Sequence, residues 1–146
     1  MRLIIFDLDE TLFRTKAKVL VVKGQTVIKR LKNQEYNKYK LASGEQFDYG
    51  EFSDAKLFNQ TSKPISKTVK TLKAYLRNAR LSDSKVIIVT ARPDFDNKDL
   101  FLETFRKFDI EVDKLYIERA GNLEKKTAAE SKTIIFKRFL DTKKYH

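Results

Sequence analysis

Residues 2–11 read Arg2-Leu-Ile-Ile-Phe-Asp7-Leu-Asp9-Glu-Thr11. The apolar half of this stretch is short and rich in β-forming residues, which predicts a strand buried on both faces, as in a parallel sheet. Two carboxylates and a threonine follow directly, at the carboxyl end of that strand. Ligands of open α/β sheets bind at this end, so Asp7, Asp9 and Thr11 are the first candidates for a functional site.

The hydrophobic pattern downstream predicts alternating helices and strands. Helices are expected over residues 66–80, 97–108 and 128–141, and strands over 85–90 and 112–117. Ser66 or Thr68 can cap the first helix, and a capping box from Thr127 to Glu130 opens the last one. Together with the first strand, this order predicts an α/β fold with a parallel sheet and right-handed crossovers.

Residues 14–63 interrupt this pattern between the first strand and the first helix. Two strands around a turn at Gly24 are expected, followed by polar sequence, which predicts an irregular insertion acting as a small cap or flap. Eleven Lys and Arg stand here against five Asp and Glu. Aromatic residues are interleaved with these bases: Tyr36, Tyr39, Phe47, Tyr49, Phe52 and Phe58. They suit stacking on unpaired nucleic-acid bases, although for most of them we favour a small core within the insertion.

Length and charge narrow the class of protein. A chain of 146 residues with 41% hydrophobic residues is expected to form one domain, residues 1–146, with a real core. The net charge of +11 favours a phosphate-rich partner, such as a nucleic acid, a nucleotide or an anionic surface. A solubilising surface charge is the alternative. A second basic stretch, 119–146, contains eight Lys and Arg against three acids.

Several classes of function are excluded or disfavoured. There is no cysteine, which excludes disulfides, thiol catalysis and Cys-based zinc sites. The single histidine is His146, the last residue, which argues against a histidine general base. No apolar run approaches the roughly 20 residues of a membrane span. The first acid, Asp7, comes after only five residues, Arg2 to Phe6, and this argues against a secretory signal. We therefore expect a cytoplasmic location and no membrane partner.

The paired acids suggest phosphoryl chemistry. One carboxylate can attack phosphorus to form an aspartyl phosphate, and the second can protonate the leaving oxygen and later activate water. The alternative is that such acids merely cap a turn. A hard divalent cation would hold the acids and the phosphate together, and Mg²⁺ prefers a few carboxylate oxygens with water and substrate.

The segment Ile4-Ile-Phe-Asp7-Leu-Asp9-Glu-Thr11-Leu resembles the first motif, hhhhDxDxT, of the haloacid dehalogenase (HAD) superfamily of phosphatases. The resemblance implies a HAD-like Rossmannoid three-layer fold with the insertion as its cap. It also implies that Asp7 is the nucleophile and Asp9 the general acid/base. The Asp7 carboxylate and the Asp9 backbone carbonyl would then bind Mg²⁺, with Thr11 on the substrate side.

Two further segments resemble later motifs of the family. Val86-Ile-Ile-Val-Thr90-Ala-Arg92 is similar to the second motif, in which the Thr90 hydroxyl and the Ala91 backbone would hold phosphoryl oxygens. Arg92 is expected either to contact the substrate phosphate or to cap a helix. The third motif is a lysine near the start of a helix. Ser131-Lys132-Thr-Ile-Ile-Phe136 resembles the polynucleotide 3′-phosphatase branch, which favours Lys132.

Other lysines compete with Lys132 for this role, Lys126 first and then Lys125 and Lys137. For any one of them the alternative is a solvated helix face. The family's fourth motif, a strand ending in an acidic pair, has no counterpart here, because Asp141 is the single acid after Glu130. Magnesium binding should therefore be weak. The acids Asp94, Asp96 and Glu118 lie near predicted strand ends and are candidates to replace the missing pair.

The sequence thus predicts a Mg²⁺-dependent phosphohydrolase acting through an aspartyl phosphate. Its expected substrates are nucleic-acid ends or nucleotides, because of the basic charge and the local resemblance to the polynucleotide branch. Two alternatives remain open. One is a phosphatase of small metabolites whose charge is incidental, and the other is a HAD-fold nucleic-acid-binding module without turnover.

Overall fold

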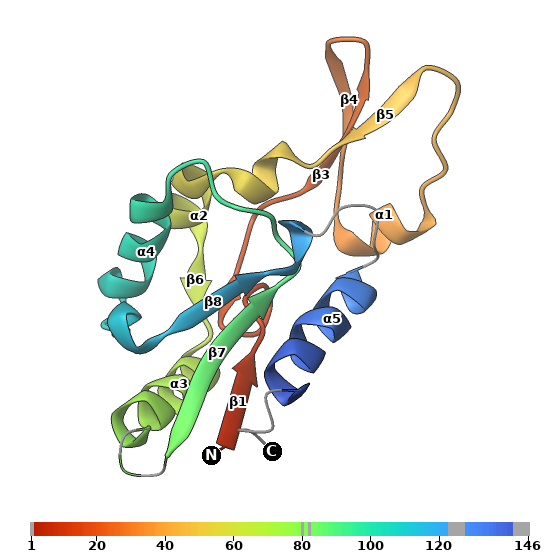
Figure 1. Cartoon of the computed structure of the whole chain (residues 1–146). Helices are drawn as coiled ribbons and strands as arrows, with labels where there is room; N and C mark the ends of the chain where they lie inside the picture. The colour runs from red at the N-terminus through yellow and green to blue at the C-terminus, as the bar shows by residue number, and fades with distance from the viewer. Residues whose placement is uncertain (1, 80, 82, 123–127, 142–146) are drawn as a thin grey trace.

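The computed structural model describes residues 2–79, 81, 83–122 and 128–141 (Figure 1). At its centre lies a three-stranded parallel sheet of β1 (Arg2–Phe6), β7 (Ser84–Thr90) and β8 (Tyr116–Arg119), in the order β1-β7-β8. Strands from distant parts of the chain are neighbours in this sheet, as in other α/β folds. The predicted α/β class with a parallel sheet is therefore confirmed.

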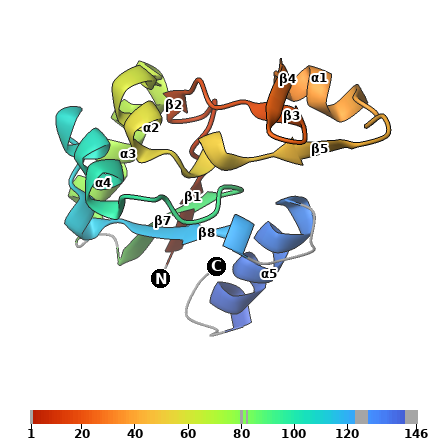
Figure 2. The ribbon, with the colours of Figure 1, turned by 90° about the horizontal axis from the view of Figure 1, so that it is seen from above.

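Helices cover both faces of this sheet. They are α2 (Ala55–Thr61), α3 (Ser66–Asn78), α4 (Lys98–Lys107) and α5 (Ala128–Asp141). Because side chains alternate along a strand, Ile87 and Val89 of β7 pack with Ile135 of α5, whereas Val86 and Ile88 join the larger core beneath α2, α3 and α4. Figure 2 shows α5 on one side of the sheet and the other three helices on the opposite side.

The first strand is less buried than its sequence predicts. β7 lies between two neighbours, and Val86 to Thr90 are all buried. β1 lies at the edge of the sheet and pairs with β7 alone among the described strands. Ile5 in β1 is 40% exposed, while Phe6 is buried. The apolar run marks a strand correctly, but the prediction of burial on both faces is wrong for β1.

The insertion is not irregular. A two-stranded antiparallel ladder of β2 (Phe13–Arg14) and β6 (Lys63–Pro64) closes its base. Beyond it, an antiparallel sheet extends away from the main body in the order β4-β3-β5 (Figure 1). This projecting sheet consists of β3 (Val19–Lys23), β4 (Thr26–Leu31) and β5 (Glu45–Asp48), with the short helix α1 (Asn33–Lys38) beside it. The predicted turn at Gly24 joins β3 to β4, and its φ of +62° is one that glycine adopts without strain.

The second half of the insertion belongs to the main core. A 3₁₀ turn, η1 (Gly50–Ser53), leads into α2, where Phe58 is 2% exposed. The Phe58 ring lies edge-on to Phe13, with centroids 5.6 Å apart, and packs against Phe101 and Phe105. The boundary 14–63 therefore describes a sequence insertion but not a separate packing unit.

Three element boundaries differ from expectation. Val112–Lys114 form a 3₁₀ turn, η2, so β8 begins only at Tyr116. The residue before α3 is Ile65, and neither Ser66 nor Thr68 caps that helix through its side chain. In α4 the side chain of Asn97 does cap, accepting from the Leu100 N–H.

The last described helix has the expected extent. α5 covers 128–141, as predicted, whereas Thr127 of the predicted capping box lies outside the described residues. The described residues include no strand after β8, and a third 3₁₀ turn, η3 (Ala120–Asn122), precedes α5 in the chain order. None of the described helices has both the length and the apolar character needed to span a bilayer.

Candidate functional site

The turn after β1 separates apolar from acidic side chains. Leu8 and Leu12 are fully buried, and the carbonyl oxygen of Leu8 accepts from the backbone N–H groups of Leu12 and Phe13 at 3.1 and 3.2 Å. On either side of Leu8, the side chains of Asp7 and Asp9 remain 44% and 27% exposed. The burial of the leucines thus presents both carboxylates at the carboxyl end of the sheet, as the sequence predicts.

Asp7 is paired with a lysine from the far end of the chain. The Lys132 Nζ donates to Asp7 Oδ2 at 3.0 Å, and the Leu8 N–H donates to Asp7 Oδ1 at 2.8 Å. Lys132 lies in the second turn of α5, with its side chain 22% exposed. Of the competing lysines, Lys137 is exposed on the same helix, and Lys125 and Lys126 lie outside the described residues. The structure therefore brings Asp7 and Lys132 together.

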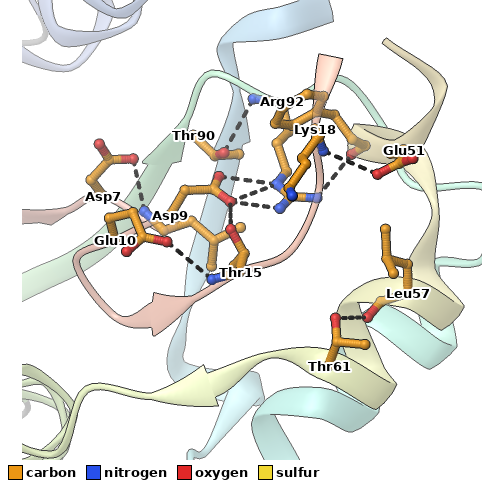
Figure 3. A network of polar contacts seen from close by, with 12 residues as sticks. Asp7, Asp9, Glu10, Thr15, Lys18, Glu51, Leu57, Thr61, Thr90 and Arg92 are labelled. Atoms are coloured by element: carbon orange, nitrogen blue, oxygen red, sulfur yellow. Dashed lines mark hydrogen bonds and ion pairs between the residues drawn. The ribbon is translucent and has the colours of Figure 1, made fainter. Parts of the chain in front are cut away.

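Asp9 is held by a different cation. The Arg92 Nε donates to both carboxylate oxygens, at 3.1 and 3.0 Å, and Nη2 donates to Oδ1 at 2.5 Å. The Thr15 hydroxyl donates to the same Oδ1 at 2.7 Å. Figure 3 shows the Asp9 carboxylate turned toward Arg92 and Thr15 and away from Asp7. The two acids are near one another in the chain but belong to separate ion pairs.

The Arg92 side chain is enclosed by other groups of the protein. Its side chain is 2% exposed, and Nη1 donates to the carbonyl oxygen of Phe52 at 3.2 Å. Three rings surround the guanidinium carbon at 5.2 to 5.4 Å, those of Phe52, Phe58 and Phe95. The guanidinium donates to a carbonyl oxygen in the last turn of η1, and contact of Arg92 with a substrate phosphate stays a prediction. Its partner is Asp9, which the sequence analysis did not predict.

The remaining predicted substrate residues lie around this pair. Thr90 is fully buried, and its hydroxyl accepts from the Arg92 backbone N–H at 3.1 Å. Ala91 is exposed in the loop after β7, and Thr11 is half-buried in the turn after Asp9. Thr90 thus shapes the loop that carries Arg92, and the contact of its hydroxyl with a phosphate stays a prediction.

A glycine that the sequence analysis missed fixes the same loop. The Gly121 N–H donates to the Arg92 carbonyl oxygen at 3.2 Å. A Cβ at Gly121 would lie 2.5 Å from the Ala91 carbonyl oxygen and from the Pro93 nitrogen, closer than any real contact allows. Only a residue without a side chain fits there. The available signal was an isolated glycine directly after a predicted strand, which often marks a close backbone approach.

The three acids considered as replacements for the missing pair have other partners. Asp96 Oδ1 accepts from the Ala55 N–H at 3.0 Å, at the start of α2. Asp94 forms an ion pair with Arg119, and Glu118 lies beside Tyr116, where its charge and hydrogen bond raise the pKa of that phenol. Among the described residues no group of three or more metal-ligating side chains gathers. The predicted substitution is therefore not supported.

Asp7 is the side chain best suited to a divalent cation. Mg²⁺ needs only one or two protein carboxylates when water and substrate phosphate supply the other oxygens. The Asp7 carboxylate is partly exposed, whereas both oxygens of Asp9 are bonded to Arg92. Of the predicted metal ligands, the Asp7 carboxylate is therefore the side chain that could hold such an ion.

The charges of the insertion are unequally neutralised. Each of its acids accepts a hydrogen bond from within the insertion: Glu35 from the Lys32 backbone N–H, Glu45 from the Tyr39 hydroxyl and the Ala42 N–H, Asp48 from the Gly50 N–H, Glu51 from the Lys18 backbone N–H and the Arg30 guanidinium, Asp54 from the Leu57 N–H. Of its eleven cations, Arg30 forms an ion pair with a described residue, and all but Lys18 are exposed. The insertion therefore presents a surplus of cations to solvent.

The aromatic residues of the insertion divide into two groups. Phe58 belongs to the main core and Phe52 to the surroundings of Arg92. The other four pack on one another: Tyr36, Tyr39, Phe47 and Tyr49, with ring centroids 4.9 to 6.2 Å apart. The favoured small core is thus present only as a cluster of partly exposed rings, in which Tyr49 is 47% exposed, and base stacking stays a prediction.

The chain matches no family model, no curated protein and no solved structure, so these comparisons assign no role to the site residues. Any function must be inferred from its own residues. Two of these observations bear most directly on chemistry: the Asp7–Lys132 pair at the end of β1, and the enclosed Asp9–Arg92 pair beside it.

Proposed function

We propose that the chain is a HAD-like, Mg²⁺-dependent phosphohydrolase that forms an aspartyl phosphate on Asp7. The observation that carries this proposal is the contact between Asp7 Oδ2 and Lys132 Nζ at 3.0 Å. Negative charge accumulates around a transferring phosphoryl group, and a positioned ammonium offsets it. A partly exposed carboxylate beside a fixed cation, at the ligand-binding end of a parallel sheet, suits this role.

The proposed reaction has two steps. An Asp7 oxygen attacks phosphorus, the bond from phosphorus to the leaving oxygen breaks, and the leaving oxygen takes up a proton. Water then attacks the phosphorus of the aspartyl phosphate, losing a proton and releasing Asp7 and inorganic phosphate. Asp9 is the proposed proton carrier. It would give a proton to the leaving oxygen in the first step and take one from water in the second, and its ion pair with Arg92 stabilises the carboxylate that accepts that proton.

Magnesium would contribute charge at the phosphate. The Asp7 carboxylate would hold the ion, with the Asp9 backbone carbonyl as the second protein ligand that the resemblance implies. Bound there, the ion would withdraw charge from the phosphoryl oxygens. Lys132, which donates to Asp7 Oδ2, would offset negative charge at the same phosphate.

The test is Mg²⁺-dependent release of phosphate from para-nitrophenyl phosphate. Asp7→Asn removes the nucleophile and should abolish release, whereas Asp99→Asn, an exposed acid at the start of α4, should leave it unchanged. Lys132→Met should lower turnover by about 10²- to 10³-fold, the usual cost of one charge-stabilising donor. Lys137→Met is the matched control on the same helix. No turnover of any phosphomonoester at millimolar Mg²⁺ would favour a binding module without catalysis.

We further propose that the substrate is a nucleic-acid end or a nucleotide. The support is the surplus of exposed cations on the insertion, whose acids are all engaged locally. Polyanion binding through such cations weakens steeply as salt rises, because counterions are released. An incidental basic charge would instead leave the affinity for a small phosphorylated metabolite nearly independent of these lysines.

A pair of charge-matched variants separates the two substrates. Replacing Lys38 and Lys40 with Gln removes two exposed cations on either side of Tyr39, and replacing Lys67 and Lys70 removes two from α3. Affinity for a single-stranded oligonucleotide should fall, and its salt dependence should flatten, in the first variant more than in the second. Equal effects of both variants, or no binding at all, would favour a small-metabolite substrate.

A further inference from the structure

The orientation of Asp9 depends on two regions of the chain. Its carboxylate accepts from Arg92, in the loop after β7, and from Thr15, at the start of the insertion. Arg92 in turn donates to Phe52 of η1, within the insertion, and the Phe52 ring lies 5.2 Å from the guanidinium carbon. One side chain thus contacts both the acid and the segment that leads from the projecting sheet into the core.

Two more hydrogen bonds join the same segments. The Asp96 N–H donates to the Ser53 carbonyl oxygen at 2.8 Å, and the Ala55 N–H donates to Asp96 Oδ1 at 3.0 Å. These bonds and the one to Phe52 connect residues 92–96 to residues 52–55. We call this arrangement the docked insertion. Since Asp96 does not contact Asp9, it offers a way to disturb docking without touching the acid.

The burial of Arg92 makes its partners interdependent. In the docked structure the guanidinium is 2% exposed, so it depends on Asp9 and the Phe52 carbonyl oxygen for its hydrogen bonds instead of on water. Removing one partner of a buried charge is much costlier than the pair itself is favourable. The planar fork of arginine can satisfy a carboxylate and a carbonyl at once, which the single ammonium of lysine cannot.

We propose that Arg92 is a positioning residue that couples docking of the insertion to the orientation of Asp9. When the insertion is docked, Arg92 and Thr15 hold the Asp9 carboxylate in one direction. When residues 52–55 separate from residues 92–96, Arg92 loses its carbonyl partner and the Asp9 carboxylate loses its fixed direction. The coupling is a property of these contacts alone. Its consequence for turnover rests on the proposed function.

A docking variant with a matched control tests the coupling directly. Asp96→Ala removes the acceptor for the Ala55 N–H, and Asp96→Asn keeps an acceptor oxygen at the same position. In NMR spectra, the Arg92 Nε–H should be protected from exchange with water in the wild type and in Asp96→Asn. In Asp96→Ala, exchange should rise about tenfold, together with exchange of the Ala55 N–H. Faster exchange at Ala55 with unchanged exchange at Arg92 would overturn the coupling.

A second variant covers the case in which Asp96→Ala leaves docking intact. Phe52→Ala removes the ring beside the guanidinium and should raise Arg92 Nε–H exchange on its own. If neither variant changes that exchange, the insertion does not control Arg92 and the proposal is wrong. These measurements need no turnover, so they remain decisive if the chain proves to be catalytically inactive.

Kinetics distinguish positioning from substrate binding if the chain is active. Arg92→Lys should lower kcat by about 10- to 100-fold, the usual range for a displaced catalytic group, with little change in KM. Arg30→Lys is the control, since Arg30 also pairs with an insertion acid, Glu51, but is 54% exposed. A rise in KM at unchanged kcat would make Arg92 a substrate-binding residue, and a rise in kcat would make its pair with Asp9 inhibitory. Either result contradicts the proposal.

Discussion

The main body and the projecting sheet are stabilised in different ways. In the main body, Phe13, Phe101 and Phe105 are fully buried, and their rings pack edge-on at 5.2 to 5.4 Å. In the projecting sheet, Val27 and Ile28 of β4 are 51% and 44% exposed. The hydroxyl groups of its tyrosines bond to one another and to Glu45 instead of being buried in a dry core.

This difference indicates how the two regions divide their roles. Burial of large apolar groups gives a rigid body that is insensitive to salt, and that body carries Asp7, Thr90 and Lys132. Exposed hydrogen bonds and partly exposed rings give a sheet that opens at lower cost and responds to pH. The contacts around Arg92 connect the insertion, which carries the less stable projecting sheet, to the more stable main body.

The largest expected effect separates the two regions by stability. Phe101→Ala removes a fully buried ring that stacks on Phe95 at 4.1 Å, and should lower the free energy of unfolding by about 3–5 kcal/mol. Phe47→Ala, in the half-buried cluster of the projecting sheet, should cost about 1–2 kcal/mol, because less area is lost. Chemical denaturation measures both. Equal losses of unfolding free energy in the two variants would show that the projecting sheet is packed as tightly as the main body.

A glycine in each region gives the next contrast. Gly121→Ala forces a Cβ against the Ala91 and Pro93 backbone and should cost about 1–3 kcal/mol, with loss of the loop that carries Arg92. At Gly24 an added Cβ would meet nothing within 4 Å, so Gly24→Ala should cost only the strain of its positive φ, about 1 kcal/mol. Thermal unfolding of both variants measures the difference. A smaller loss of stability in Gly121→Ala than in Gly24→Ala would mean that the loop after β7 shifts to accommodate the added Cβ.

A smaller effect concerns the tyrosine pair of the projecting sheet. Partial burial and the bond to the Tyr36 hydroxyl raise the pKa of Tyr49 to about 12. Tyr36→Phe keeps the ring and removes the hydroxyl, so the pKa of Tyr49 should fall toward its ordinary value. The stability cost should be about 0.5–1.5 kcal/mol, that of one hydrogen bond. If an ultraviolet titration of Tyr49 in Tyr36→Phe matches that in the wild type, the pair of Tyr36 and Tyr49 does not form in solution.

The smallest expected effect is a pH response of the projecting sheet. Hydrogen bonds from the Ala42 N–H and the Tyr39 hydroxyl lower the pKa of Glu45. A lowered folded-state pKa stabilises the fold above the unfolded-state value, and that contribution disappears as pH falls through the folded-state value. Glu45→Gln should therefore flatten the acid-side dependence of amide exchange in β5, whereas Glu103→Gln on α4 should not. Identical profiles for the two variants would contradict the assignment to Glu45.

Local patterns in the sequence were enough to predict several elements. The apolar runs before Asp7 and Thr90 predicted β1 and β7, and the helical periodicity predicted α5 with its observed extent. The choice of Lys132 among the lysines came from the resemblance, and the structure places that lysine against Asp7. The predictions of β1, β7 and α5 share a cause, since each depends on residues close together in the chain.

The failures share the opposite cause. The pair of Asp9 with Arg92 joins residues 83 positions apart, and its existence depends on how two strand-end loops face each other. The inclusion of Phe58 in the main core depends on how the chain returns from the projecting sheet. The exposure of β1 depends on the order of strands, which hydrophobic pattern alone does not determine. Each required tertiary packing that no local signal encodes.

The position of β1 at the margin of the parallel sheet has a further consequence. On its outer side, away from β7, the described residues supply no strand to pair with its backbone, and the exposed Ile5 leaves an apolar spot there. Such a margin is a template for strand addition and self-association. A segment that added in parallel register would finish next to Asp7, because parallel strands end at a common rim.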